Sequence, residues 1–106
     1  MKYHAHVFFE LDQLDKIQEL HFRLQQELSN PIVVGRLLYK AVGPLPKPMF
    51  QIDFEQAELQ QVKLVLAQVC YGFSILIHPI LGNEYLAHTH YAEWMGLPLK
   101  LNLEQL

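Results

Sequence analysis

Four short stretches of the chain show alternating hydrophobic and polar residues or a β-branched run, and in two longer stretches hydrophobic residues recur at helical spacing. Alternation puts successive side chains on opposite faces of a strand, whereas a repeat of three to four residues puts them on one face of a helix. The pattern predicts strands at residues 3–9, 32–39, 49–54 and 73–78, and helices at residues 12–28 and in the stretch that ends at Gly72.

Polar residues at the expected helix ends support this division. Asp12 is the predicted N-cap of the first helix, and Asn30-Pro31 ends it. Asp53 and Gln56 have the spacing of a capping box that opens the second helix. These signals fix where the periodic segments begin and end.

The resulting order is strand, helix, strand, strand, helix, strand, which is typical of the ferredoxin-like α+β fold. We therefore expect an antiparallel four-stranded sheet with strand order 4-1-3-2 and both helices on one face. Residues 1–106 form one domain, and residues 79–106 are a C-terminal tail over or beside the sheet.

Composition excludes several kinds of partner. The formal net charge is −3 and no basic run is present, which argues against nucleic acid binding. The single cysteine, Cys70, rules out an intrachain disulfide and a multi-cysteine zinc site. We find neither a signal peptide nor an apolar run of the ~20 residues that a membrane helix needs. A cytoplasmic protein is expected.

Histidine is the unusual residue, and five of the six histidines fall in two patches, His4 with His6 and His78 with His88 and His90. Alternation puts the histidines of each strand on the face opposite its apolar set. In the predicted topology the end of the fourth strand meets the start of the first. His78 should then lie beside His4 and His6, and the tail should bring back His88 and His90.

Three neutral imidazoles on one face are a candidate site for a divalent metal ion. A carboxylate in place of one imidazole would give the facial triad of non-haem iron(II) oxygenases, and Glu84 and Glu93 are candidates for it. The alternatives without a metal ion are that these carboxylates are solvated and that the histidines are ordinary surface residues. His21 is expected at the core edge, and Cys70 as a small buried residue.

Three blocks of sequence resemble the DOPA 4,5-dioxygenase family: YHAHVFFE, VGPLPKPMFQIDF and ILIHPILGNEYLAHTHYAEWMGLPLKL. The resemblance implies a ferredoxin-like fold and extradiol cleavage of a catechol such as DOPA by molecular oxygen. Iron(II) is the implied cofactor, with zinc or another divalent metal as alternatives. The implied metal ligands are His6, His78 and His88, and the implied acid–base residues are His90 and His4.

The sequence departs from the family pattern at three positions. Leu45 stands where many members have a histidine, Gln51 where some have a glutamate, and Ala87 where many have an aspartate. These departures leave open whether a carboxylate completes the metal site.

A small aromatic substrate would need an apolar wall and polar anchors. The predicted substrate-binding residues are Gln51, Phe8, Leu76 and Arg36. Two other functions remain open: a non-catalytic dimeric ligand-binding module, and a zinc-dependent hydrolase that uses the same histidines. A homodimer is expected in each case, because a short tail covers one sheet face poorly.

Overall fold

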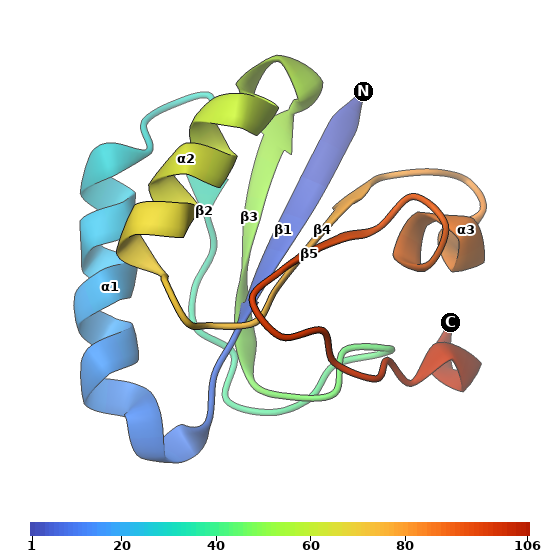
Figure 1. Cartoon of the computed structure of the whole chain (residues 1–106), viewed down its shortest axis with the longest axis horizontal. Coiled ribbons are helices and arrows are strands. Elements are labelled where there is room, and N and C mark those ends of the chain that lie inside the picture. Colours follow the sequence, from blue (N-terminus) through green and yellow to red (C-terminus); the bar gives the residue numbers. More distant parts are fainter.

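The computed structural model describes all residues, 1–106, and forms one sheet with a helical layer on one side (Figure 1). The sheet has five strands in the order β2-β3-β1-β4-β5, with every neighbouring pair antiparallel. The elements are β1 (Lys2–Phe8), α1 (Leu14–Glu27), β2 (Val33–Val34), β3 (Met49–Glu55), α2 (Leu59–Val69), β4 (Ile75–Pro79), α3 (Glu84–His88) and β5 (Glu93–Met95). The predicted ferredoxin-like order 4-1-3-2 is confirmed, with one strand added beside β4.

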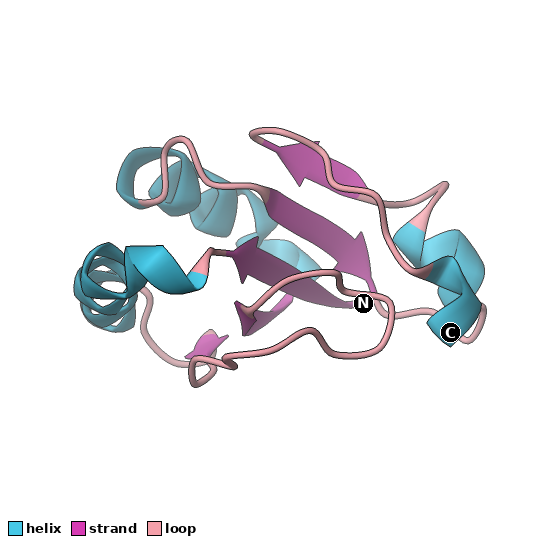
Figure 2. Cartoon of the chain, turned by 90° about the horizontal axis from the view of Figure 1, so that it is seen from below, coloured by secondary structure: helices cyan, strands magenta, loops and turns pink.

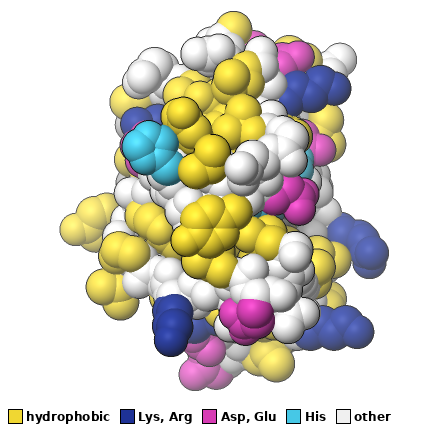
Figure 3. Space-filling view, turned by 90° about the vertical axis from the view of Figure 1, so that its right-hand side faces the viewer, with side chains coloured by type: hydrophobic (Ala, Val, Ile, Leu, Met, Phe, Trp, Pro, Cys, Tyr) yellow, Lys and Arg dark blue, Asp and Glu magenta, His cyan; other side chains and the backbone are white.

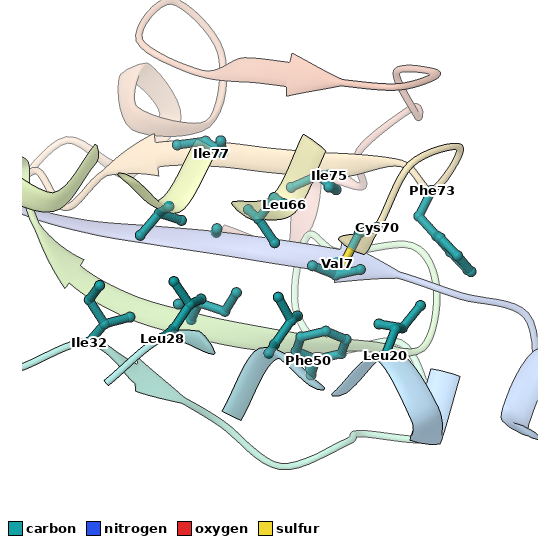
Figure 4. Packing of buried hydrophobic residues seen from close by; sticks show 14 of the residues in the cluster. Val7, Leu20, Leu28, Ile32, Phe50, Leu66, Cys70, Phe73, Ile75 and Ile77 are labelled. Atoms are coloured by element: carbon teal, nitrogen blue, oxygen red, sulfur yellow. The ribbon is translucent and has the colours of Figure 1, made fainter. Parts of the chain in front are cut away.

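The main core lies between the sheet and the helices α1 and α2 (Figure 4). Ala5, Val7 and Phe9 point into it from β1 and the residue that follows, as the alternation predicted. Phe50 from β3 and Ile77 from β4 join them. Seventeen buried apolar residues form this cluster, so the helical face is where most apolar surface leaves water.

The C-terminal segment covers the other face of the sheet. Figure 2 shows the helices α1 and α2 on one side of the strands and α3 with the chain end on the other. A second cluster lies here, made of Phe8, Leu45, Met49 and Leu76. Trp94 packs against it and stacks on Phe8, with ring centroids 5.9 Å apart. The tail is therefore anchored by its own apolar contacts.

The tail also adds β5, which the sequence patterns did not predict. Leu76 pairs with Trp94 in the β4–β5 ladder, and Ile77 pairs with Glu93. Only three residues take part, too few for a periodic signal. The edge of β4 is thus covered by the chain itself.

The strand predicted at residues 32–39 is shorter in the structure. Val34 pairs with Ile52, and the next pair is Leu38 with Met49. Between these pairs three residues, 35–37, oppose two residues, 50–51, which is a β-bulge. The chain runs close to β3 here, because a side chain at Gly35 would meet the carbonyl oxygen of Gln51 at 2.9 Å.

Both predicted helix caps were placed a few residues away from the observed ones. Glu10, not Asp12, is the N-cap of the first helical turn, and its amide donates to Oε1 of Gln13 at 2.8 Å. In the second case the amide of Glu55 donates to Oε1 of Glu58 at 2.9 Å. β3 runs on to Glu55 because it pairs there with β1, and this moves the cap beyond Asp53. No helix of the structure has both the length and the apolar character to cross a membrane.

Candidate metal centre

Histidines from two neighbouring strands meet on the sheet face that α1 and α2 leave free. His4 and His78 are direct partners in the β1–β4 ladder, and His6 lies two residues along β1 on the same face. Their ring centroids lie 5.1 to 5.7 Å apart. One nitrogen from each ring can be chosen so that all three lie within 4.8 Å of one another. Three nearby histidines can therefore hold a metal ion, in the arrangement that alternation and strand order predicted.

His6 and His78 form the tightest part of this cluster. Their Nε2 atoms are 3.0 Å apart, and both side chains are buried, with 3% and 4% of their surface exposed. Two nitrogen ligands at right angles, each about 2.1 Å from one ion, would stand about 3.0 Å apart. The spacing of this pair thus fits two adjacent ligands of one metal ion.

The two rings differ in their hydrogen bonds: Nδ1 of His78 has a partner and Nδ1 of His6 has none. Nδ1 of His78 donates to the carbonyl oxygen of Pro79 at 2.9 Å, so its Nε2 keeps a lone pair. A hydrogen bond between the two Nε2 atoms then requires His6 to donate. That tautomer leaves Nδ1 of His6 as an acceptor, and this atom is buried without a partner. The pair is not satisfied by hydrogen bonds alone, which is unusual for buried polar groups.

Burial keeps these imidazoles neutral at pH 7. It lowers the pKa of His78 from 6.5 to about 4 and lowers the pKa of His6 well below its ordinary value. The pKa of His4 is lowered mainly by burial, although the nearby Asp53 carboxylate acts in the opposite direction. Neutral imidazole is the form that binds metal ions, so neither ring has to lose its net proton near neutral pH; in His6 the proton would move from Nε2 to Nδ1.

His4 connects the cluster to a polar strip on β3. Its Nε2 lies 3.4 Å from Oδ1 of Asp53, and the same oxygen accepts a hydrogen bond from Nε2 of Gln51 at 2.7 Å. His4 is only half-buried, unlike His6 and His78. Histidine and carboxylate at this distance form a pair that can store and pass a proton.

Helix α3 brings a fourth histidine to the cluster. Asn83 caps this helix by accepting from the amide of Leu86 at 3.0 Å, and His88 is its last residue. Nδ1 of His88 donates to the carbonyl oxygen of Glu84 at 2.8 Å, which leaves its Nε2 free. The ring of His88 lies 4.2 Å from that of His78, centroid to centroid.

Five other residues singled out in the sequence lie away from the cluster. His90 is exposed and packs edge-on against Tyr91. Glu93 pairs with Lys63 of α2. His21 lies at the core edge, as expected, and its Nε2 donates to the carbonyl oxygen of Gly35 at 2.7 Å. Cys70 is buried, and burial raises its pKa to about 12, so the thiol stays protonated. Arg36 is exposed.

A cavity of about 330 Å³ opens beside the histidines. His4, His6, His78 and His88 line one side of it, and Gln51 lies among the lining residues as predicted. The opposite wall is apolar. It comes from the segment before β3, from the first residue of β3 and from the segment between β4 and α3, and it includes Leu38, Val42, Leu45, Met49, Ile80 and Leu81. A cavity with an apolar wall and a few polar groups suits a small organic ligand.

Two comparisons with known proteins bear on this site. The family model of the Dopa 4,5-dioxygenase family matches residues 3–105 of the chain. The chain belongs to the Dopa 4,5-dioxygenase family. A crystal structure of a candidate dioxygenase from Nostoc punctiforme is also similar, with 32% sequence identity and a TM-score of 0.87. The alignment covers 97% of this chain and 88% of that one. No significant match was found among curated proteins.

The Dopa 4,5-dioxygenase family assignment agrees with the resemblance seen in the sequence, but the cavity differs from the predicted substrate site. Phe8 and Leu76 do not line it, because Trp94 and the tail cover them. Arg36 does not line it either. Most of the wall was not predicted, because Val42, Leu45, Ile80 and Leu81 come from connections without periodic patterns. The only available signal was the proline-rich segment before Met49, which excludes a central strand and must run across a surface.

Proposed function

We propose that the protein is a metal-dependent extradiol dioxygenase that cleaves a catechol, or a related aromatic compound, with molecular oxygen. The observation that carries the proposal is the buried, neutral pair of His6 and His78, whose Nε2 atoms stand 3.0 Å apart beside a cavity of about 330 Å³. Membership of the Dopa 4,5-dioxygenase family supports the reaction class.

We propose His6, His78 and His88 as the metal ligands. In His78 and His88 the Nδ1 atom donates to a backbone carbonyl, which fixes the ring and leaves Nε2 free. A bound divalent ion, expected to be iron(II), would act as a Lewis acid and bring the substrate and oxygen together. His4 is the competing third ligand, because a ring nitrogen of His4, unlike one of His88, belongs to the group whose ligand atoms all lie within 4.8 Å of one another.

We assign the acid–base role to His4, positioned by Asp53. The 3.4 Å separation lets the carboxylate stabilise a protonated His4 after it takes a proton from a catechol hydroxyl. Gln51 holds Asp53 in place through its 2.7 Å hydrogen bond. His90, the other acid–base residue predicted from the sequence, is exposed and does not line the cavity, so we give it no part in the reaction.

The aromatic ring of the substrate would pack against Leu38, Leu45 and Met49. Leu45 and Met49 belong to the same buried cluster as Phe8 and Leu76. Phe8 and Leu76, which were predicted to contact the substrate, would therefore not touch it. They would instead pack behind Leu45 and Met49 and hold these wall residues in place. This wall excludes water from one side of the reacting ring.

The test is anaerobic reconstitution with iron(II), followed by addition of a catechol and air. We expect oxygen uptake matched by a new visible absorbance from the ring-opened product. His78→Ala should bind iron more than about 100-fold more weakly and lose turnover, since loss of an outer-shell partner alone costs about 10- to 100-fold. His90→Ala is the matched control and should retain both. Full iron occupancy in His78→Ala would contradict the ligand assignment.

A second pair of variants decides the third ligand. His88→Ala should lose iron, whereas His4→Ala should keep iron and lose turnover. The opposite result would make His4 the ligand and His88 the neighbouring acid–base group. In both outcomes circular dichroism of the variants should match that of the parent protein.

A zinc-dependent hydrolase is the second candidate, and the compact group of His4, His6 and His78 without a carboxylate among them favours it. Three histidines with an open fourth position are typical of catalytic zinc. Turnover that requires zinc and proceeds without oxygen would replace the dioxygenase with this function. Protein that stays metal-free in medium supplied with iron and zinc would favour a non-catalytic module.

The homodimer and the cytoplasmic location remain predictions. The homodimer was expected because one sheet face had no cover, yet the tail packs Trp94, Leu99 and Leu101 onto that face. Light scattering of the purified protein tests the first prediction, and fractionation of the source cells tests the second.

A further inference from the structure

The walls of the cavity carry no fixed positive charge. The chain has eight lysine and arginine residues, and none of them lines the cavity. The one acidic side chain among the lining residues is Glu84. A substrate whose ring substituent is a carboxylate would find no cationic partner here, apart from any metal ion that engages the catechol oxygens.

Glu84 lies close to where such a substituent would extend. It is the first residue of α3, and His88 is the last, so the two stand four residues apart on one face of the helix. The ring of His88 lies beside that of His78 in the metal centre. Glu84 is exposed and forms no salt bridge, which puts a free carboxylate at the mouth of the cavity, about one helical turn from the histidines.

Lysine and arginine side chains line neighbouring hollows and not the cavity itself; Lys2, for example, lines a hollow that shares His4 and Ile80 with it. Figure 3 views the molecule from the side of α3 and the C-terminal segment, and apolar side chains gather over the middle of this face. Arg36 and Lys40 line a separate hollow, which shares only Leu38 and Val42 with the cavity. Lys47 is paired with Glu10.

We propose that the cavity selects catechols whose ring substituent is cationic or neutral over those that carry a carboxylate, and that Glu84 is the specificity-determining residue. The inference rests on the proposed function, because it takes the catechol oxygens to be held at the histidines. A substituent ammonium would then meet the Glu84 carboxylate at the mouth, and a carboxylate would be repelled by it.

The test measures binding without turnover, by calorimetry on the iron(II)-loaded protein under argon. The probes are dopamine, 4-ethylcatechol and 3,4-dihydroxyphenylacetate, which share the catechol and differ in substituent charge. One unit charge near an exposed carboxylate changes affinity about fivefold, so attraction of one probe and repulsion of another should separate dopamine from the acid by about tenfold after screening. The neutral probe should fall between them.

Substitution of Glu84 should change this ratio. Glu84→Gln should bring the two charged probes to within about twofold of each other, and Glu84→Lys should reverse their order. Glu19→Gln is the matched control, because it removes the same charge from an exposed position on α1, and the ratio should stay as in the parent. Added salt should shrink the preference of the parent protein.

The outcomes separate this inference from the proposed function. If 4-ethylcatechol binds but the acid binds as tightly as dopamine, or the ratio is unchanged in Glu84→Gln, the inference is overturned and the dioxygenase proposal stands. If none of the three probes binds the iron-loaded protein, both fail. Tighter binding of the acid that is lost in Arg36→Gln would overturn the role of Glu84 and assign selectivity to Arg36.

Discussion

The two faces of the sheet are built from the same strands, yet they differ in what they bury. The helical face carries a cluster of seventeen buried residues, all of them apolar. The other face carries a cluster of four buried apolar residues, together with Ala87 of α3 and the only two buried polar side chains of the protein, His6 and His78. One face therefore supplies most of the stability, and the other holds polar groups at a cost in stability.

The contrast shows how a small domain can tolerate a buried histidine pair. Burying polar groups without full hydrogen bonding is unfavourable, and Nδ1 of His6 has no partner. Ala5 and Val7 alternate with His4 and His6 along β1 and lie fully in the main core. The strand is held in place from its helical side, so the histidines on its other side need not contribute to stability.

The largest expected effect comes from breaking the helical face. Phe50→Ala removes a fully buried ring from the main core and should lower the free energy of unfolding by about 3–5 kcal/mol, as measured by urea denaturation. The neighbouring Gln51→Ala acts on the opposite face of β3 and should cost less than about 1 kcal/mol. Equal losses in the two variants would contradict the division of roles between the faces.

Acid should weaken the metal-free protein through the histidine face. The pKa of His78 is about 4 in the folded protein and 6.5 when unfolded, so between these values only the unfolded chain takes up the proton. The contribution of neutral His78 to the free energy of unfolding is fully present above pH 6.5. It falls as the pH drops toward 4, and the loss from this residue alone is about 3 kcal/mol. His6 should add to the loss, because its pKa is also lowered.

Urea denaturation of metal-free protein at pH 7, 5.5 and 4 measures this slope. His78→Gln, which cannot titrate, should give a shallower dependence on pH than the parent. A parent protein equally stable at pH 7 and pH 4 would show that the histidines are not neutral when folded. Bound metal should raise the stability without flattening this slope, since a nitrogen that holds a metal ion takes up no proton in the folded state.

A smaller effect is expected where the tail joins the sheet. Gly96 follows β5 with φ of +70°, and a Cβ there would meet the carbonyl oxygen of Phe73 at 2.3 Å. Gly96→Ala should cost about 2 kcal/mol, because a left-handed conformation and a backbone clash combine. Gly43→Ala is the control: φ is +55° but nothing lies within 4 Å, so about 1 kcal/mol is expected. Thermal unfolding of both variants distinguishes the clash from the conformation.

Alternation and strand order were enough to predict the meeting of His4, His6 and His78. These features depend only on which face each strand buries, and the apolar set in each strand decides that face. The walls of the cavity could not be predicted in the same way. Val42 and Leu45 come from a connection without periodicity, and the strand predicted at residues 32–39 leaves its regular pairing with β3 at a bulge before Leu38.

The interpretation of Phe8 and Leu76 shows a related limit. Alternation put both side chains on the histidine face, and that is where they are. It could not show that Trp94 would stack over Phe8, because that contact depends on the three-residue strand β5. The face of a residue follows from its own strand, whereas exposure on that face depends on distant segments.

The separation of His6 and His78 along the chain has a consequence for biosynthesis. The two residues are 72 positions apart, so the first leaves the ribosome long before the second has been made. At 5–20 residues per second the delay is roughly 4 to 15 seconds. During that time the nascent chain offers His4 and His6 without His78, and two histidines alone make a weak site for metal ions. A metal ion would then bind only after β1 and β4 have paired, because that pairing brings His78 beside His4 and His6.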